Sequence, residues 1–300
     1  MDAFRIETLT TTHGIFDDIA DATYILTMEN ATDRHKSIYE QLKWFHPTKK
    51  VNIWFNGGYK KHVKIGATGE RIDNTFKDLT HANIMIFKDA LKNNYNRIIV
   101  LEDDFIMSKK ILDADIQNDI TSFVSNNEID CYSFGCIPFV NNISTIFNNH
   151  VKLHVFGATH SMLYSKDGME KILDAYKSNS FFKEDIDYIT SVVLDIKYTY
   201  HIPLSFQLFA ETENYKTWGT GCGYIMDNII SPSNYYLLKL LKMDEADDQE
   251  NKWINVYMYI KIIHLLIYII LIVLIYLGIK KIYPSISNKS IFKRISNEQI

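Results

Sequence analysis

"RIIVLEDDFI", residues Arg97–Ile106, joins a run of four apolar residues to three consecutive carboxylates. Four apolar residues in a row, Ile98–Leu101, are typical of a strand inside a parallel sheet whose two faces are both covered. We therefore expect this strand deep inside an α/β domain. Because ligands bind beyond the carboxyl ends of the strands in open α/β sheets, the carboxylates should lie at the edge of a cleft.

Glu102, Asp103 and Asp104 repel one another, and their ionised forms are stabilised only by water or by a positive partner. A hard divalent cation is the natural partner. Mg²⁺ or Mn²⁺ is usually held by one or two protein carboxylates and completes its shell with water and substrate phosphates. The alternative is a solvated turn that caps the following segment. The apolar strand before the triplet favours the metal site.

The composition indicates a folded chain with a large core. The 300 residues are 47% hydrophobic and 13% aromatic, which at the usual size of about 150 residues per domain allows one or two domains. The net charge of -4 favours no nucleic-acid partner, and the chain has no glycine-rich phosphate loop of the Walker type. The three cysteines, Cys131, Cys136 and Cys222, indicate a reducing environment rather than a disulfide framework.

Apolar runs and amphipathic patterns alternate along the first 242 residues. The expected strands are Ala22–Met28, Val51–Phe55, Ile98–Leu101, stretches within Cys131–Ile137 and Leu153–Ser165, and Ile196–Ile202. The expected helices are Asp33–Phe45, Phe76–Asn94, Asp167–Tyr176 and Glu184–Leu194. Strand, helix and strand at these spacings predict an α/β sandwich with right-handed crossovers.

A long apolar segment lies near the C-terminus. Ile262–Ile279 runs for eighteen residues without a formal charge, and as a helix it would be about 27 Å long, nearly enough to span a bilayer core. Lys261 precedes it and Lys280 and Lys281 follow it. A buried core helix of this length would normally carry a polar face. We therefore expect a single membrane anchor.

Two features of the sequence give opposite predictions for the orientation of this anchor. No apolar signal segment opens the chain, so insertion is expected to depend on the C-terminal segment, with the large domain in the cytosol. The excess of lysine and arginine after the segment favours the opposite orientation, and a lumenal domain stays open. The predicted organisation is a globular domain at residues 1–242, an acidic spacer at 243–253, a transmembrane anchor at 254–281 and a basic tail at 282–300.

Several short motifs follow one another at characteristic spacing. They are "ILTMENATDR" (Ile25–Arg34), "LTHANIMIFKDAL" (Leu79–Leu91), "VLEDDF" (Val100–Phe105), "GATHSMLYSKDGMEKIL" (Gly157–Leu173), and "DIDYI" with "PLSFQ" within Asp185–Gln207. In this order, from about residue 22 to 210, the chain resembles glycosyltransferase family 25, which contains bacterial lipo-oligosaccharide glycosyltransferases and procollagen galactosyltransferases. Thr27 and Thr80 stand where the family has Asn and Ser.

The resemblance implies a GT-A-like fold, in which a Rossmann-like mixed sheet flanked by helices binds a nucleotide sugar and an acidic motif holds a divalent metal. It implies Asp104 as the direct metal ligand, with Glu102 as a second. It also implies a donor site for the nucleotide sugar, and that site would contain Thr27, Arg34, His81, Glu102 and Asp103. The metal would be Mn²⁺ or Mg²⁺.

An inverting transfer also needs a carboxylate that deprotonates the acceptor hydroxyl. Asp187 is the first candidate by resemblance, and Asp185 is the second. Each assignment has a structural alternative. Arg34 could be a surface charge at a helix start, His81 a packed core histidine, and the two aspartates helix N-terminal charges favoured by the dipole. Trp218 and the nearby Gly219–Tyr224 could form an acceptor platform or a lid.

The predicted function is a membrane-anchored, metal-dependent glycosyltransferase. It would move a sugar from a nucleotide sugar, a UDP-hexose by family habit, to a hydroxyl of a glycan or protein acceptor. The first alternative is a membrane-anchored binding or scaffold protein with the same fold and no turnover. The second is a metal-dependent phosphohydrolase.

Overall fold

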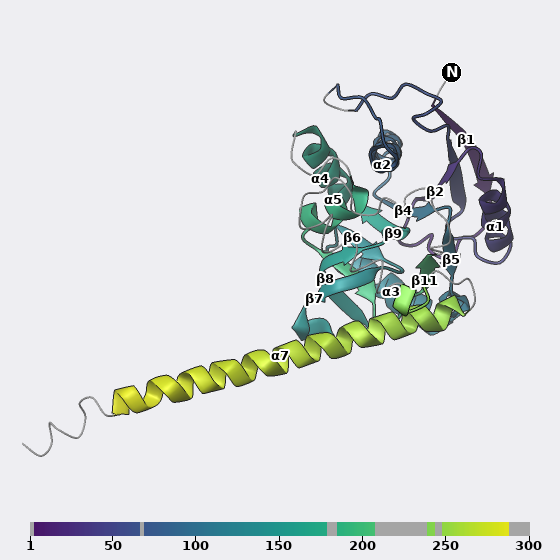
Figure 1. Cartoon of the computed structure of the whole chain (residues 1–300). Coiled ribbons are helices and arrows are strands. Elements are labelled where there is room, and N and C mark those ends of the chain that lie inside the picture. The colour runs from purple at the N-terminus through teal and green to yellow at the C-terminus, as the bar shows by residue number, and fades with distance from the viewer. Residues whose placement is uncertain (1–2, 67–68, 179–184, 208–238, 244–247, 288–300) are drawn as a thin grey trace, which may run out of the picture. The chain divides into compact units, whose positions relative to one another are not determined.

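The computed structural model describes residues 3–66, 69–178, 185–207, 239–243 and 248–287 (Figure 1). The chain divides into two compact units, Met1–Tyr257 and Met258–Ile300. The first unit is an α/β domain, and the second contains most of a long C-terminal helix.

Nine strands of the described residues form one mixed sheet, in the order β1-β3-β2-β4-β9-β6-β10-β8-β7. The strands are β1 (Phe4–Thr10), β2 (Ala22–Met28), β3 (Lys50–Asn56), β4 (Arg97–Glu102), β6 (Cys131–Ser133), β7 (Ile137–Asn141), β8 (His150–Gly157), β9 (Ser161–Ser165) and β10 (Lys197–Tyr200). Strands β2, β3 and β4 are parallel, whereas β9 runs antiparallel between β4 and β6. A separate pair, β5 (Phe105–Met107) and β11 (Ser205–Gln207), forms directly after the acidic triplet.

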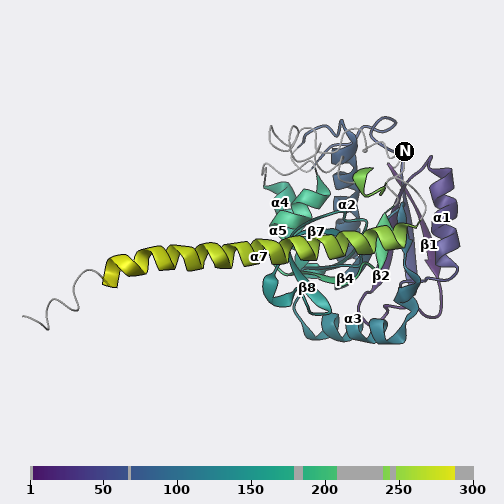
Figure 2. The ribbon, with the colours of Figure 1, turned by 60° about the horizontal axis from the view of Figure 1, so that its bottom comes forward.

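Helices cover both faces of the sheet, and Figure 2 shows α4 and α5 on the side opposite to α3. The helices are α1 (Thr32–Leu42), α2 (Thr75–Lys92), α3 (Ala114–Asn126), α4 (Lys166–Lys177) and α5 (Ile186–Val193), with short 3₁₀ turns η1 (Lys109–Leu112) and η2 (Ile143–Thr145). Residues of α2, α4 and α5 belong to one buried apolar cluster, and residues of α1 and α3 belong to another.

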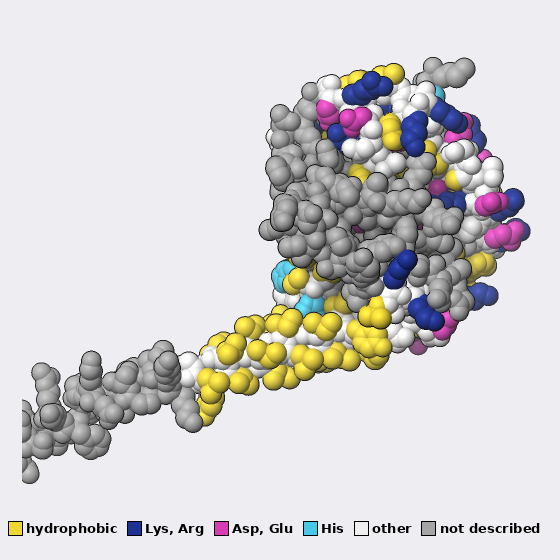
Figure 3. All heavy atoms as spheres, viewed as in Figure 1, with side chains coloured by type: hydrophobic (Ala, Val, Ile, Leu, Met, Phe, Trp, Pro, Cys, Tyr) yellow, Lys and Arg dark blue, Asp and Glu magenta, His cyan; other side chains and the backbone are white. Residues whose placement is uncertain are grey.

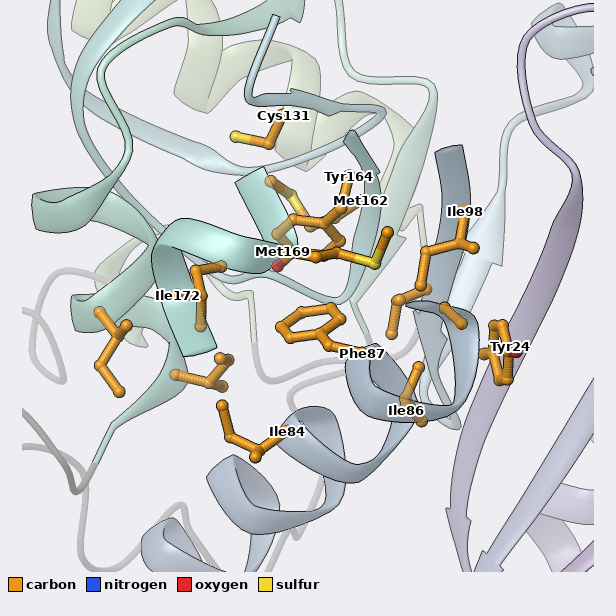
Figure 4. Packing of buried hydrophobic residues seen from close by; sticks show 14 of the residues in the cluster. Tyr24, Ile84, Ile86, Phe87, Ile98, Cys131, Met162, Tyr164, Met169 and Ile172 are labelled. Atoms are coloured by element: carbon orange, nitrogen blue, oxygen red, sulfur yellow. The ribbon is translucent and has the colours of Figure 1, made fainter. Parts of the chain in front are cut away.

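Strand β4 supplies side chains to both clusters. Ile98 and Val100 pack with α2 and α4, whereas Ile99 and Leu101 pack on the other face. Figure 4 shows the first cluster, in which the Phe87 ring of α2 lies 4.9 Å from the Tyr164 ring of β9. The apolar run therefore reflects burial on both faces. It does not require a wholly parallel sheet, because β4 has one parallel and one antiparallel neighbour.

The mixed α/β class predicted from the sequence is confirmed, and most predicted elements are found with shifted ends. Two predicted strand regions are each split in two. Cys131–Ile137 is interrupted after Ser133, because the chain turns at Gly135, where a Cβ would lie 2.0 Å from the Ser205 carbonyl oxygen. Leu153–Ser165 is interrupted where Ala158 adopts a left-handed φ of 64°, which breaks a strand.

The first turns of α7 (Gln249–Ser287) belong to the domain rather than to a linker. Trp253 is fully buried, and its ring lies edge-on to His160 at 5.4 Å. Tyr257 is buried, and its hydroxyl accepts a hydrogen bond from the Cys136 backbone N–H at 3.1 Å. The sequence placed these residues in the acidic spacer and at the start of the anchor. The compact unit extends through Tyr257 instead of ending near residue 242.

From Met258 to Ile279, α7 is mostly apolar, and Figure 3 shows hydrophobic side chains along this part of the helix. Residues Gln249–Ile279 have a mean hydropathy of 2.9 in their most apolar window, and 6% of that window is buried. One helix of the described residues is therefore long and apolar enough to cross a membrane.

Replacing Trp253 tests whether the root of α7 is part of the domain core. In the full chain in detergent, Trp253→Ala should lower the free energy of unfolding by about 3–5 kcal/mol, because it empties a buried aromatic site. Tyr259→Ala is the control, since Tyr259 lies on the same helix and is 45% exposed. Denaturant unfolding followed by circular dichroism measures both. Equal stability of the two variants would show that the helix root does not support the domain.

Candidate functional site

The carboxyl ends of β2 and β4 bring the first site residues together. Leu26 of β2 pairs with Glu102 of β4, so the two strands end side by side. Asp103 is buried, and its Oδ2 accepts hydrogen bonds from the Thr27 hydroxyl at 2.8 Å and from the Met28 backbone N–H at 3.3 Å. The predicted Thr27 and Asp103 are therefore direct neighbours, and Asp103 ties the two strand ends together.

Arg34 lies in the first turn of α1 and faces the acidic triplet. Its guanidinium donates to Asp103 and lies 4.0 Å from Asp104 Oδ2. Burial opposes the charged form, but the carboxylates of Asp103, Asp104 and Glu102 outweigh it and raise the Arg34 pKa. The side chain is 32% exposed. Arg34 is thus a partly buried counter-ion of the triplet, with guanidinium donors that still reach solvent.

Asp104 is the most deeply confined carboxylate of the triplet. One oxygen, Oδ2, accepts from the Gln207 side-chain amide at 3.0 Å, whereas Oδ1 is buried without a hydrogen-bond partner among the described residues. Burial, followed by the charge of Asp103, raises the Asp104 pKa to about 7, against the lowering effects of Arg34 and Gln207. A buried, partner-less carboxylate oxygen has the character of a ligand for a hard cation.

Glu102 occupies the last position of β4. Its backbone N–H donates to the His160 carbonyl at 2.9 Å. Burial raises its pKa well above the ordinary value, and the charges of Asp104, Asp187 and Asp103 raise it further. The contribution of Asp187 shows that the structure brings the downstream aspartate into the same electrostatic neighbourhood as the triplet.

The helix α5 presents the two downstream aspartates. Asp185 is its N-cap and accepts from the Asp187 backbone N–H at 2.9 Å. Burial, followed by the charge of Asp187, raises the Asp185 pKa to about 7. The Asp187 carboxylate accepts from the backbone N–H groups of Ala158 at 2.8 Å and Thr159 at 3.2 Å, and also from the Thr159 hydroxyl.

The backbone around Ala158 adopts a strained conformation that directs these N–H groups toward Asp187. A non-glycine residue with φ of 64° is uncommon and costs free energy. Here it points two successive N–H groups at one carboxylate, which resembles an anion-binding nest. Asp187 is therefore bound to the loop between β8 and β9. The Asp185 carboxyl, by contrast, has a pKa of about 7.

His81 lies in α2, apart from the residues around the triplet. Its ring stacks on Phe4 at 6.2 Å. Burial, followed by the charge of Lys64, lowers its pKa. Lys64 and Asp78 form a buried ion pair of 2.5 Å beside it. The assignment of His81 to the donor site stays a prediction, and its surroundings are those of a packed histidine.

Sequence reasoning did not assign a role to two glutamines that complete the site. Gln207 reaches Asp104 because β11 pairs with β5. Gln41 of α1 donates to the Phe105 carbonyl at 2.6 Å and accepts from the Met107 N–H at 2.8 Å. The hydrophobic periodicity of the sequence does not mark such polar residues, although Gln207 is the last residue of the "PLSFQ" motif. Trp218 and Gly219–Tyr224 lie outside the described residues.

In the part of the chain that the structure describes, no group of three or more His, Cys, Asp and Glu side chains converges as in a protein-only metal site. A cation that takes one or two protein carboxylates and fills its shell with water and phosphates needs no such cage. The unpartnered Oδ1 of Asp104 fits a cation of that kind.

No protein-family model matches this chain, and no curated protein matches it. Among solved structures it is similar to A197 from STIV, with a TM-score of 0.32 and 12% identity over 62% of this chain and 82% of that one. It is also similar to a glycosyltransferase involved in the glycosylation of the major capsid of PBCV-1, with a TM-score of 0.33 and 11% identity over 69% of this chain and 86% of that one. Similarity at this level carries no functional conclusion.

The raised pKa of Asp104 predicts a pH-dependent stability. The folded state binds this proton more tightly than the unfolded state, whose Asp pKa is about 3.9. The contribution of Asp104 to stability is therefore largest below pH 4, falls as the pH rises to about 7, and is constant above that value.

Asp104→Asn should flatten this dependence and raise the melting temperature of the ligand-free chain at pH 8, where the wild type carries a penalised charge. Asp33→Asn is the control, because the Asp33 side chain is 93% exposed on the same helix as Arg34. Melting temperatures of the three proteins between pH 4 and 8 measure the effect. Parallel curves for all three would contradict the assignment of a strained carboxyl to Asp104.

Proposed function

We propose that this chain is a membrane-anchored, metal-dependent glycosyltransferase with a GT-A-like fold. It would transfer a hexose from a UDP-sugar to a hydroxyl of a glycan or protein acceptor. The observation that carries the proposal is the buried Asp104, which lies just beyond the end of β4 in a run of three carboxylates. One of its oxygens has no hydrogen-bond partner among the described residues. Arg34 supplies one positive charge against three carboxylates, so a bound divalent cation would stabilise the site further.

Asp104 would hold the divalent cation, and Glu102 would lie close enough to bind the cation or its water. When bound, a cation of this kind neutralises the negative charge that develops on the diphosphate leaving group. Arg34 would donate its remaining N–H groups to the nucleotide or its phosphates, which suits its planar fork. Asp103 would fix the position of Arg34, since it accepts from that guanidinium and from Thr27.

The acceptor hydroxyl needs a base if the transfer inverts the anomeric carbon. Asp185 suits this role better than Asp187. Its pKa of about 7 is near the optimum for a general base at neutral pH. The proton of the hydroxyl would pass to Asp185 as the new bond to the anomeric carbon forms and the bond to the diphosphate breaks. Asp187 would hold the loop at Ala158 and Thr159.

A second candidate is a non-catalytic protein that binds nucleotide sugars. The observation in its favour is the saturation of Asp187, because a carboxylate with three donors is stabilised as a structural anion. This candidate predicts metal-dependent binding without release of nucleotide. A phosphohydrolase would instead release phosphate without a preference for the sugar.

Activity on sugar nucleotides tests the proposal directly. The full chain in detergent is incubated with a panel of sugar nucleotides and Mn²⁺, and free nucleotide is measured with and without a chelator. Asp104→Asn should lower kcat/KM at least about 100-fold, the usual scale for losing one preorganised electrostatic group. Asp33→Asn should leave it unchanged. A wild-type chain that neither binds nor turns over any sugar nucleotide with Mn²⁺ would refute the proposal.

The two downstream aspartates should separate in their effects. Asp185→Asn should remove the limb of the pH–rate profile that rises towards pH 7 without lowering the melting temperature, because asparagine is also a good N-cap. Asp187→Asn should instead lower the melting temperature, because the Ala158 and Thr159 N–H groups lose a charged acceptor. Measuring both quantities for both variants distinguishes a base from a structural anion. If instead Asp187→Asn removed the limb of the pH–rate profile and Asp185→Asn lowered the melting temperature, Asp187 would be the base.

A further inference from the structure

The hairpin formed by β7 and β8 carries an unusual group of exposed apolar side chains. Their exposed fractions range from 39% to 79%. The hairpin patch, as we call it, consists of Phe139, Val140, Ile143, Phe147 and Val155. Val140 and Val155 are cross-strand partners, so the patch continues from one strand to the other.

The position of the patch in the sheet makes its exposure costly. Strand β7 is the last strand of the nine-stranded sheet, and no strand of the described residues pairs with its outer edge. Soluble proteins protect such edges with charges, prolines or bulges, and an apolar edge invites association. Clustered exposed apolar side chains therefore indicate a surface that contacts a partner or a membrane.

The root of the apolar helix lies beside this hairpin. The Tyr257 hydroxyl contacts the backbone N–H of Cys136 at 3.1 Å, and Cys136 directly precedes β7. The same hydroxyl lies 3.3 Å from the Thr199 hydroxyl. Thr199 pairs with Val151 of β8. The last part of α7 that belongs to the domain is thus held by Cys136, just before β7, and by Thr199 of β10, the strand that pairs with β8.

The chain leaves little distance between this contact and the apolar span. From Tyr257 to Ile262, where the uncharged run begins, there are five helical steps, or about 7.5 Å of helix at 1.5 Å per residue. So short a connection limits how far along the chain the start of the hairpin can lie from the point where the span begins.

We propose that the hairpin patch is a second membrane contact, seated in the interfacial region of the bilayer that α7 crosses. Aromatic and aliphatic side chains partition into this region, and two such attachments restrict a domain far more than one anchor does. A single helix would let the domain rotate about its axis. The hairpin patch would fix which side of the domain faces the lipid.

Gly157 connects the patch to the candidate site. A Cβ at this position would lie 3.1 Å from the Phe139 ring and 3.9 Å from an Asp187 carboxylate oxygen. Membrane contact by the hairpin patch would therefore hold the Asp185 and Asp187 side of the site close to the bilayer surface. Given the proposed transferase function, on which this step rests, the acceptor would be a hydroxyl carried by a membrane-bound molecule.

Site-specific labelling tests the membrane contact without any activity measurement. Phe147→Cys is introduced into the full chain together with Cys222→Ser, while Cys131 and Cys136 stay because both are buried. An environment-sensitive fluorophore on residue 147 is then followed in phosphatidylcholine bilayers that contain nitroxide lipids. Ile6→Cys is the matched control, since Ile6 is exposed on β1 at the opposite edge of the sheet.

The label on residue 147 should show blue-shifted emission and loss of intensity from the nitroxide lipids, and the label on residue 6 should show neither. Ile143→Cys provides a second position on the patch if the first variant folds poorly. Equal, solvent-like emission at residues 147 and 6 would overturn the proposal. Energy transfer between copies labelled at residue 147, without lipid quenching, would also overturn it and assign the patch to a second copy of this chain. Because no turnover is measured, these outcomes are independent of the proposed transferase activity.

Discussion

Electrostatic repulsion at the end of β4 is the constraint on which the candidate site depends. Three consecutive carboxylates emerge from a strand that is buried on both faces, and Arg34 supplies a counter-charge to them. The pKa values of Glu102 and Asp104 rise because burial and mutual repulsion exceed the attraction of that one guanidinium. The repulsion between the carboxylates destabilises the ligand-free fold. A cation bound there would remove this repulsion, and the free energy gained would add to the affinity for the metal and its phosphates.

Neutral groups from distant segments hold the acidic segment in place. Gln41 binds both Phe105 and Met107 from α1, and Gln207 reaches Asp104 from β11. These amides stabilise the backbone and one carboxylate without cancelling the net charge. These hydrogen bonds therefore fix the position of the triplet and leave its net negative charge uncompensated. A site that binds a cation requires this arrangement.

The sequence predicted most elements that carry their own periodicity. It missed β1 and α3, and also the strands that depend on distant contacts. The apolar run Ile98–Leu101 and the amphipathic α2 carry their own periodicity, and so does the long apolar helix. The neighbourhood of Thr27, Arg34 and Asp103 followed from motif order and is found in the structure. Strands β5 and β11 were not predicted, because each has three residues and exists only through pairing with the other. The hydrogen bonds to Asp187 depend on the left-handed conformation of Ala158, which cannot be predicted from a pattern of side chains.

The burial of Trp253 and Tyr257 links the root of α7 to the site through the core. His160 packs against Trp253 with its ring and accepts from the Glu102 N–H with its carbonyl, so one residue joins the helix root to the end of β4. A flexible spacer would have separated membrane attachment from the geometry of the acidic triplet. A root inside the domain instead places the start of α7 against the residue that binds the Glu102 N–H. The root of α7 is therefore part of the structure that supports the site.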